Sequence, residues 1–307
     1  MSDGKVHIAL VADQRYWPGL EATKRSMLAA SRSPERLVFH VFGEQEVAAI
    51  GPDIRRNFGT YKGSVMAFVR LFFPQMLPNL DWLIYADVDT LWFRDPCELW
   101  DLRDESVSVQ WVQDVPSVRR ERTELHRAWN PSFDQNRYAC TGVLLMNLKR
   151  MRERSVFARC VEFAQRYGTQ KYADQDILNS VLCDDAGMLP VHWDVIRDID
   201  PSVVGGTPET LGLVLHVEGI GKYFHASPGG RLPQFDIWYK CAYGHFMLSW
   251  SKRFIFRCLA VLYPILRHVP VRDEIKRAFF FAWLRNRFRG ELRPFLENNL
   301  IEGRKCR

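Results

Sequence analysis

Two aspartates separated by one residue, Asp87 and Asp89, directly follow an apolar run from Trp82 to Ala86. Along an extended chain, residues i and i+2 project to the same side, so the two carboxylates could share one hard divalent cation. The apolar run predicts a buried strand, and the carboxyl ends of such strands are where open α/β sheets bind ligands. A solvated turn is the alternative interpretation of this triplet.

A second group of candidate residues extends from His216 to Lys222, after a short apolar run. Histidine is a common metal ligand, and Lys222 offers a compact positive charge to phosphate oxygens. Gly219 and Gly221 would let the backbone approach a diphosphate closely. The alternative is a core histidine followed by an ordinary glycine turn.

Two further segments combine polar side chains with apolar helical patterns. Asp174, Gln175 and Asp176 begin a segment with helical spacing, where carboxylates suit the helix dipole; simple capping is the alternative. Arg70 stands in the otherwise apolar run 65–73. A buried arginine must pair with a carboxylate or a phosphate, whereas an arginine on a half-exposed helix could extend to solvent.

The hydrophobic pattern predicts the elements that must position these residues. Strand-length apolar runs alternate with helical spacing, which favours an α/β fold with a mostly parallel central sheet. The expected strands are 6–12, 37–42, 82–86, 141–146 and 213–216, and the expected helices are 21–30, 64–74, 151–167 and 172–182. Ser64 is the expected N-cap of the helix that Pro74 ends.

Charge divides the chain into a mildly acidic body and a basic tail. The net charge is +6, and residues 251–307 carry 14 Lys/Arg against 5 Asp/Glu. With a boundary near Tyr243, this predicts a catalytic domain over 1–243 and a basic, amphipathic helical tail over 244–307. The tail fits an anionic membrane surface, unless its helices simply pack on the domain. It has no recognised nucleic-acid motif, so no nucleic acid is expected as a partner.

Seven scattered cysteines without a CxxC pair argue against a structural zinc site and are typical of reduced thiols. No signal peptide precedes the first strand-like run. The longest apolar run of the tail contains Arg257 and Pro264 and is too short to span a bilayer. We therefore expect a cytoplasmic protein with peripheral attachment to the cytoplasmic face of a membrane.

Six segments, in the same order, resemble glycosyltransferase family 8, the family of bacterial lipopolysaccharide galactosyltransferases and glycogenin. They are 12–16, 64–74, 83–89, 138–147, 174–176 and 216–222. The resemblance covers most of the chain. It departs from the family at Cys140-Thr141-Gly142, where Asn-Ala-Gly is frequent, at Arg15, where Asn is frequent, and at Tyr223-Phe224, where Pro-Trp is frequent.

The resemblance implies a GT-A nucleotide-diphospho-sugar transferase fold, a UDP-sugar donor and a Mn²⁺ or Mg²⁺ cofactor. It implies that the metal is held by Asp87, Asp89 and His216. It implies that the donor is bound by Asp13, Tyr16, Arg70, Val88, Thr141, Gly219 and Lys222. Of the two residues expected to be catalytic, Gln175 would lie beside the anomeric carbon and Asp174 at the sugar.

These features predict a retaining transferase that moves galactose or glucose to a glycan or lipid-linked acceptor, in lipopolysaccharide or other surface-glycan synthesis. The charge that grows on UDP would be neutralised by the divalent ion and Lys222. Gln175 is a poor nucleophile, which favours attack by the acceptor on the face that UDP leaves. The alternative is a catalytically inactive UDP-sugar or glycan-binding module, against which the presence of all three expected metal ligands argues.

Overall fold

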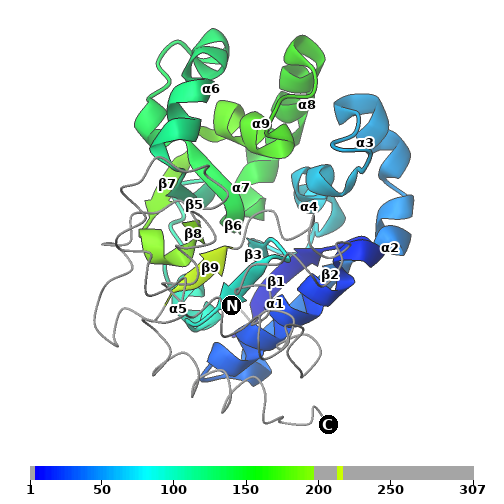
Figure 1. Cartoon of the computed structure of the whole chain (residues 1–307), viewed down its shortest axis with the longest axis vertical. Coiled ribbons are helices and arrows are strands. Elements are labelled where there is room, and N and C mark those ends of the chain that lie inside the picture. The colour runs from blue at the N-terminus through cyan, green and yellow to red at the C-terminus, as the bar shows by residue number, and fades with distance from the viewer. Residues whose placement is uncertain (1–3, 197–212, 217–307) are drawn as a thin grey trace, which may run out of the picture. The chain divides into compact units, whose positions relative to one another are not determined.

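A computed structural model describes residues 4–196 and 213–216 of the 307-residue chain (Figure 1). The described residues form two compact units. The first contains residues 4–14, 35–87 and 96–194, and the second contains 15–34, 88–95, 195–196 and 213–216. The expected boundary near Tyr243 and the basic tail lie outside the described residues.

The first unit contains a six-stranded sheet in the order β2-β1-β3-β6-β5-β7. β1 pairs in parallel with β2 and β3, and β5 with β7, while β6 is antiparallel to both of its neighbours. The prediction of a mostly parallel sheet is therefore confirmed. The strands are β1 (Val6–Val11), β2 (Leu37–Phe42), β3 (Trp82–Ala86), β5 (Val109–Gln113), β6 (Ala139–Asn147) and β7 (Ala186–Leu189).

The helices of this unit enclose a large apolar core against the sheet. Ala9 and Val11 of β1 and Leu83 of β3 pack there with residues of the helical segments that follow β2 and β6. The α-helices are α2 (Glu44–Ala48), α3 (Gly51–Phe58), α4 (Phe73–Met76), α5 (Pro96–Trp100), α6 (Pro116–Trp129), α7 (Leu148–Glu153), α8 (Val156–Tyr167) and α9 (Ala173–Leu182). The 3₁₀ helices are η3 (Met66–Phe72), η4 (Gln135–Arg137) and η5 (Val191–Trp193), and η1 (Gln14–Tyr16) and η2 (Pro34–Arg36) lie where the chain passes between the units.

The helix predicted over 64–74 is wrong in type and in its end. Residues 66–72 form the 3₁₀ helix η3, and Pro74 lies in the first turn of α4 rather than ending a helix. A proline suits that position because its missing N–H has no helical partner there. The Ser64 hydroxyl still accepts a hydrogen bond from the Met66 N–H at 3.2 Å, although Val65 is the N-cap of η3.

Two other predictions differ in detail. The helix expected over 151–167 is broken at Ser155, whose φ of 51° is left-handed, into α7 and α8. The Asn147 side chain caps α7 by accepting a hydrogen bond from the Arg150 N–H at 3.0 Å. The strand β2 was expected to be buried but is mostly half-buried, because it is the edge of the sheet.

The pairing of β6 with β5 is interrupted in its middle. Trp111 of β5 lies opposite Leu144, whereas the next residue, Val112, lies opposite Cys140. Residues 141–143 therefore have no opposite residue on β5. The main-chain groups of this stretch are free of that ladder and can serve other side chains.

The second unit combines one helix with a small sheet. α1 (Trp17–Ala30) begins earlier than predicted, with Pro18 in its first turn. The sheet has the order β4-β9-β8, with β4 (Thr90–Trp92) antiparallel and β8 (Val195–Ile196) parallel to β9 (Val214–His216). α1 holds β4 through the Thr23 hydroxyl, which donates to the Thr90 carbonyl at 2.8 Å.

Within the described part of the chain, no helix combines the length and the apolar character that crossing a bilayer requires.

Candidate active site

Arg70 is the centre of a buried charged cluster in the first unit. Its Nη2 lies 2.8 Å from Oδ1 of Asp87, and its Nε lies 3.1 Å from Oδ2 of Asp174. The second contact is an ion pair without hydrogen-bond alignment. The guanidinium also lies 4.1 Å from the ring centre of Tyr85. Arg70 is thus buried and paired with carboxylates, and the interpretation as a solvent-extended arginine is wrong.

One guanidinium shared by two carboxylates leaves this cluster with a formal charge of −1. Burial is the main cause that raises the pKa of Asp174 to about 6, while Arg70 opposes that shift. Asp174 also receives a long contact of 3.4 Å from the Thr141 hydroxyl. A partly desolvated carboxylate of this kind is suited to accept hydrogen bonds from the hydroxyls of a bound ligand.

Asp87 is positioned by both of the strands that meet at its main chain. It follows β3, its N–H donates to the Gly142 carbonyl at 2.7 Å, and the Tyr85 hydroxyl donates to its carboxylate. Residues 87–89 form a turn between β3 and β4 rather than an extended segment. The expected same-side projection of Asp87 and Asp89 along a strand is therefore not the geometry here.

Asp89 pairs with His216 in the second unit. β4 and β9 place Thr90 opposite His216, and this register brings His216 Nε2 to 3.3 Å from Asp89 Oδ1. Both side chains are largely buried. A carboxylate oxygen and an imidazole nitrogen at this spacing fit a shared divalent cation, as the donor set predicted from the sequence requires.

Gln175 lies in the first turn of α9 and is held by three contacts. Its Nε2 donates to Asp114 Oδ2 at 2.8 Å and to the Tyr138 hydroxyl oxygen at 3.0 Å. Its Oε1 accepts a hydrogen bond from the Thr141 N–H at 3.2 Å. The amide is therefore fixed at both ends.

The interrupted stretch of β6 supplies main-chain groups to these side chains. The Thr141 N–H serves Gln175, and the Thr141 carbonyl accepts from Arg70 Nη1 at 2.5 Å. The Gly142 carbonyl serves Asp87, as described above. Main-chain groups at this break in the β5–β6 pairing thus hydrogen-bond to Arg70, Asp87 and Gln175.

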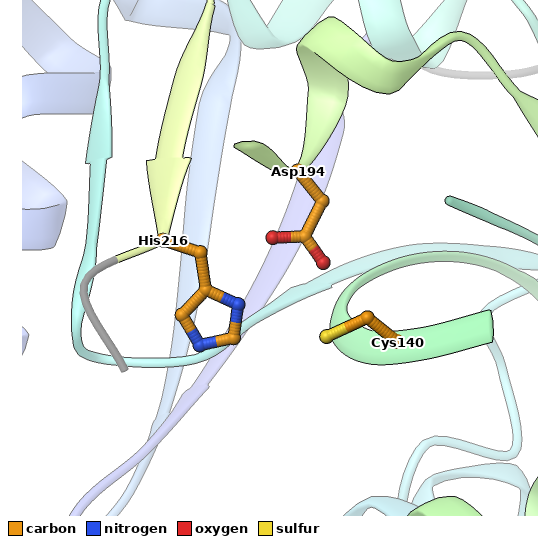
Figure 2. A group of neighbouring side chains, drawn as sticks. All are labelled: Cys140, Asp194 and His216. Atoms are coloured by element: carbon orange, nitrogen blue, oxygen red, sulfur yellow. The ribbon is translucent and has the colours of Figure 1, made fainter. Parts of the chain in front are cut away.

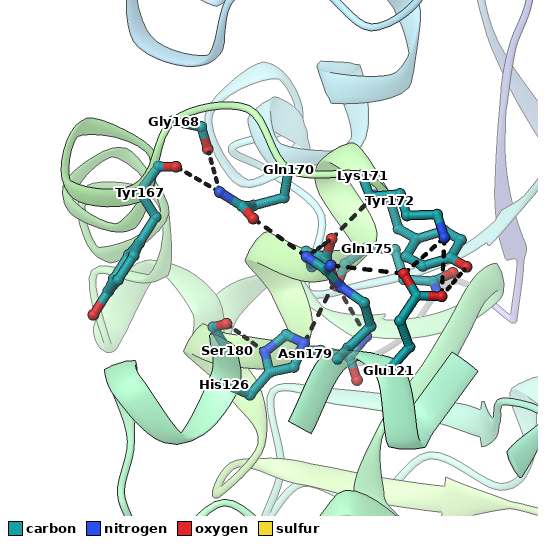
Figure 3. Close-up of polar contacts among 12 residues, drawn as sticks. Glu121, His126, Tyr167, Gly168, Gln170, Lys171, Tyr172, Gln175, Asn179 and Ser180 are labelled. Carbon is teal, nitrogen blue, oxygen red and sulfur yellow. Dashed lines mark hydrogen bonds and ion pairs between the residues drawn. The ribbon is translucent and has the colours of Figure 1, made fainter. Parts of the chain in front are cut away.

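Asp176 is fully buried and its carboxylate is saturated with contacts. Arg122 of α6 donates to both oxygens, at 3.0 and 2.9 Å, and the Tyr172 N–H donates at 3.0 Å. His126 Nε2 lies 3.4 Å away, and its other nitrogen contacts Ser180 at 2.6 Å (Figure 3). Burial alone would raise the pKa of Asp176, but the neighbouring His126 ring and the Arg122 guanidinium outweigh burial and lower it. Asp176 therefore joins α6 to the start of α9, where it also accepts from the N–H of the N-cap residue Tyr172.

A second pair of ligand-type atoms was not expected from the sequence. The Cys140 sulfur on β6 lies within 4.8 Å of a carboxylate oxygen of Asp194, which follows η5, and both side chains are buried. Figure 2 shows Cys140 and Asp194 pointing toward each other, and it also draws His216 at the end of β9. Asp194 carries no sequence signal that would have marked it.

The remaining predicted site residues are placed as follows. Asp13 is buried just beyond the end of β1, the strand beside β3, so it lies at the same sheet edge as Asp87. Tyr16 is the N-cap residue of α1, and Val88 is buried; both belong to the second unit. Gly219 and Lys222 lie outside the described residues.

The sequence reasoning missed four residues of the first unit that contact the site: Asp114, Arg122, His126 and Tyr138. Tyr138 lies in 138–147, one of the six segments that resemble the family, but the sequence predicts no role for it. Asp114 directly follows β5, a strand that was not predicted because Gln110 and Gln113 interrupt its apolar residues. The two α6 residues have helical spacing of four, which alone does not distinguish a buried face from a solvated one.

The segment that contains this site is similar to known proteins. Residues 56–203 match the family model described as glycosyl transferase family 8. Glucoside xylosyltransferase 1 of Danio rerio is 33% identical over 239 residues, 63% of this chain and 57% of that protein. The Mus musculus protein of the same name is 30% identical over 239 residues, 64% of this chain and 57% of that protein.

Solved structures agree in fold. A crystal structure of galactosyltransferase LgtC in complex with donor and acceptor sugar analogs has a TM-score of 0.60 at 21% identity, covering 81% of this chain and 99% of that chain. The apo structure of the bifunctional glycosyltransferase WbbM has a TM-score of 0.57 at 18% identity, covering 73% and 49%.

The architecture is therefore the GT-A fold of glycosyltransferases, as the resemblance implied. The segment that matches glycosyl transferase family 8, residues 56–203, contains the side-chain contacts of Arg70 and Gln175 described above. The chain spans 33–57% of the length of the six curated relatives that it matches.

Proposed function

We propose that this chain is a retaining glycosyltransferase that moves a hexose, galactose or glucose, from a UDP-sugar to a glycan or lipid-linked acceptor. Its role would be in lipopolysaccharide or other surface-glycan synthesis. The observation that carries the proposal is the buried cluster in which Arg70 joins Asp87 to Asp174, with Gln175 fixed beside it through Thr141.

Each residue of the cluster has a task in such a reaction. Arg70 keeps the carboxylates of Asp87 and Asp174 in place, so that neither must be ordered when the donor binds. Asp174 offers a carboxylate oxygen to a sugar hydroxyl. Gln175 presents an amide whose orientation is already set, which suits a group that must lie beside the anomeric carbon without attacking it.

The cation site is proposed to consist of Asp87, Asp89 and His216. The fit rests on the 3.3 Å approach of His216 to Asp89 and on Asp87 standing two residues earlier in the chain. An imidazole together with carboxylates suits Mn²⁺ better than Mg²⁺, which prefers oxygen ligands. A bound cation would supply positive charge to the diphosphate as the sugar–phosphate bond breaks. In the same proposal Lys222 and Gly219 contact the diphosphate, and Asp13, Tyr16 and Val88 contact the nucleoside.

Retention follows from where the acceptor attacks. The described site holds no carboxylate that is both unpaired and beside Gln175, since Asp114, Asp174 and Asp176 are all engaged. The acceptor oxygen would form its bond to the anomeric carbon on the face that UDP leaves. Its proton would pass to an oxygen of the departing diphosphate, so atoms and charges balance without a protein base.

A pentose donor is the second candidate, because the relatives described above carry the name glucoside xylosyltransferase 1. The test is a UDP-release assay with UDP-galactose, UDP-glucose and UDP-xylose, each with Mn²⁺ and with a chelator. Mn²⁺-dependent release from a hexose donor supports the proposal, and release from UDP-xylose alone replaces the hexose by xylose. Donor binding without release from any donor would show the inactive binding module.

The proposal includes the location of the enzyme. Residues 244–307, which lie outside the described structure, would attach it to the anionic cytoplasmic face of a membrane, where lipid-linked acceptors are exposed. The support is the excess of basic residues in 251–307 and their interleaving with aromatic side chains.

A further inference from the structure

The amide of Gln175 is surrounded by groups whose hydrogen-bonding sense cannot be reversed. A main-chain N–H, that of Thr141, can only donate, so it requires the amide oxygen. The carboxylate of Asp114 accepts, so it requires the amide nitrogen. These two contacts agree on one orientation of the side chain, with Oε1 toward β6 and Nε2 toward Asp114.

Tyr138 is the third contact, and a hydroxyl could in principle donate or accept. It is fully buried, and its oxygen lies 3.0 Å from Gln175 Nε2 and 3.0 Å from Asp176 Oδ1. Burial raises the pKa of Tyr138 well above its ordinary value, so the hydroxyl keeps its proton. That single proton is directed to the carboxylate, which leaves the oxygen to accept from Gln175.

The other contacts of Asp176 hold its carboxylate in place, so the Tyr138 hydroxyl has this acceptor in a fixed position. Its oxygens are held by the Arg122 guanidinium at 3.0 and 2.9 Å and by the Tyr172 N–H at 3.0 Å. The donor directions in this chain of contacts are therefore fixed: Gln175 donates to Tyr138, and both Tyr138 and Arg122 donate to Asp176.

We propose that Tyr138, oriented by Asp176, is a positioning residue for the Gln175 amide in the transfer reaction. The proposal rests on the function proposed above, in which Gln175 lies at the anomeric carbon. Without the Tyr138 hydroxyl, Gln175 keeps Asp114 and Thr141 as partners but loses the contact that joins it to the rigid α6–α9 anchor. The amide then samples other rotamers, and the transfer step slows while donor binding is retained.

The test is the variant Tyr138→Phe, with Tyr167→Phe as the matched control. Tyr167 also has one hydroxyl contact, to the Ala128 carbonyl at 3.0 Å. Its link to Arg122 runs through Gln170 and its own main-chain carbonyl, which the substitution keeps. We expect Tyr138→Phe to lower kcat about 10-fold to 100-fold with the donor KM within about two-fold of wild type, and Tyr167→Phe to leave both unchanged. Equal kcat in wild type and Tyr138→Phe would overturn the proposal.

A double-mutant cycle separates positioning from a general structural role. If Tyr138 acts through Gln175, then Tyr138→Phe in a Gln175→Ala background changes kcat by less than about two-fold. A loss as large as in the wild-type background would show that Tyr138 merely supports the fold.

A measurement without turnover distinguishes failure of this proposal from failure of the proposed function. The side-chain NH₂ signals of Gln175, in protein labelled with ¹⁵N-glutamine, are those missing in Gln175→Ala. We expect them to shift and to exchange faster with water in Tyr138→Phe but not in Tyr167→Phe. Unchanged signals in Tyr138→Phe overturn the positioning role even if no UDP-sugar proves to be a donor.

Discussion

The guanidinium of Arg70 lies 2.8 Å from the carboxylate of Asp87, the first aspartate of the Asp-Val-Asp triplet. A buried cation is therefore already in place beside a residue proposed to hold a second cation. Asp174, 3.1 Å from the same guanidinium, supplies the other negative charge that makes this arrangement stable. Arg70 thus both neutralises buried carboxylates of the fold and positions residues of the proposed active site.

Replacing Arg70 by methionine should destabilise the fold as well as remove activity. It leaves the carboxylates of Asp87 and Asp174 without their cation, which costs about 3–5 kcal/mol for a buried pair. Urea unfolding measures the change. Arg56→Met is the control, because Arg56 and Asp53 form an exposed pair whose loss costs less than about 1 kcal/mol. Equal stability in the two variants would contradict the buried pairing.

Asp89→Asn should abolish UDP release and weaken Mn²⁺ binding, with less than about 1 kcal/mol lost in stability, because in the proposed site Asp89 binds the cation and is not part of the apolar core. Asp87→Asn is less informative, since it also removes a partner of Arg70.

His216→Ala should weaken Mn²⁺ and UDP binding together, whereas Lys222→Ala should weaken UDP binding more. Calorimetric titration measures both affinities. Asp53→Asn is the control, and full turnover of Asp89→Asn at saturating Mn²⁺ would remove Asp89 from the cation site.

Stability should fall as the pH is lowered from 8 to 6. Burial lowers the pKa of His126 and of His40, so the unfolded chain binds these protons before the folded protein does. The slope approaches about 1.4 kcal/mol per pH unit for each group below the unfolded pKa near 6.5. The pKa of Asp174, raised to about 6 by burial, gives the opposite slope between about pH 4 and 6, so the range from 6 to 8 isolates the histidines.

The measurement is the urea midpoint as a function of pH in wild type and in His126→Gln. The substitution keeps a polar side chain near Asp176 and Ser180 while removing the titrating ring. We expect a shallower pH dependence, with the remainder due to His40. An unchanged slope would show that His126 takes up its proton equally in both states.

The product should keep the anomeric configuration of the donor. The reason is that no unpaired carboxylate stands beside Gln175 in the described site to act as a base for attack from the opposite face. Proton NMR of the first-formed glycoside gives the answer from its anomeric coupling constant. A β-linked product from an α-linked UDP-sugar would exclude retention.

The full chain should sediment with acidic liposomes at low salt and stay in the supernatant with neutral ones. The attraction is about 1 kcal/mol per basic residue near the surface and is screened by salt. A chain that ends at residue 243 is the comparison, with its fold checked by circular dichroism. If the full chain fails to sediment with acidic liposomes, the tail has no role at a membrane.

Elements of the fold that depend on local pattern were predictable. The strand that ends before Asp87 and the helix that begins at Ala173 were placed within one residue, because apolar runs and helical spacing are local properties. The break at Ser155 was not predictable, since a left-handed serine has no sequence signature. Nor was the 3₁₀ form of η3, which carries Arg70.

The partners of the site residues were less accessible than the residues themselves. Arg70 in an apolar run left two possibilities, a buried arginine paired with a carboxylate or phosphate and an arginine extended to solvent, and the structure supplies Asp87 and Asp174 as its partners. Asp114 and Tyr138 became visible only through the sheet, because β5 and β6 bring them together from different parts of the sequence. Contacts between side chains that are far apart in the sequence produce no characteristic spacing, so a sequence motif cannot reveal them.

The unpaired stretch of β6 has a consequence for mutational tolerance. Thr141 holds Arg70 through its carbonyl and Gln175 through its N–H, and every amino acid except proline has both groups. These two contacts should therefore survive a change of Thr141 to alanine, which removes only the hydroxyl contact with Asp174. The structure depends here on the number of residues between 140 and 144. A single insertion or deletion should therefore be far more damaging than a substitution.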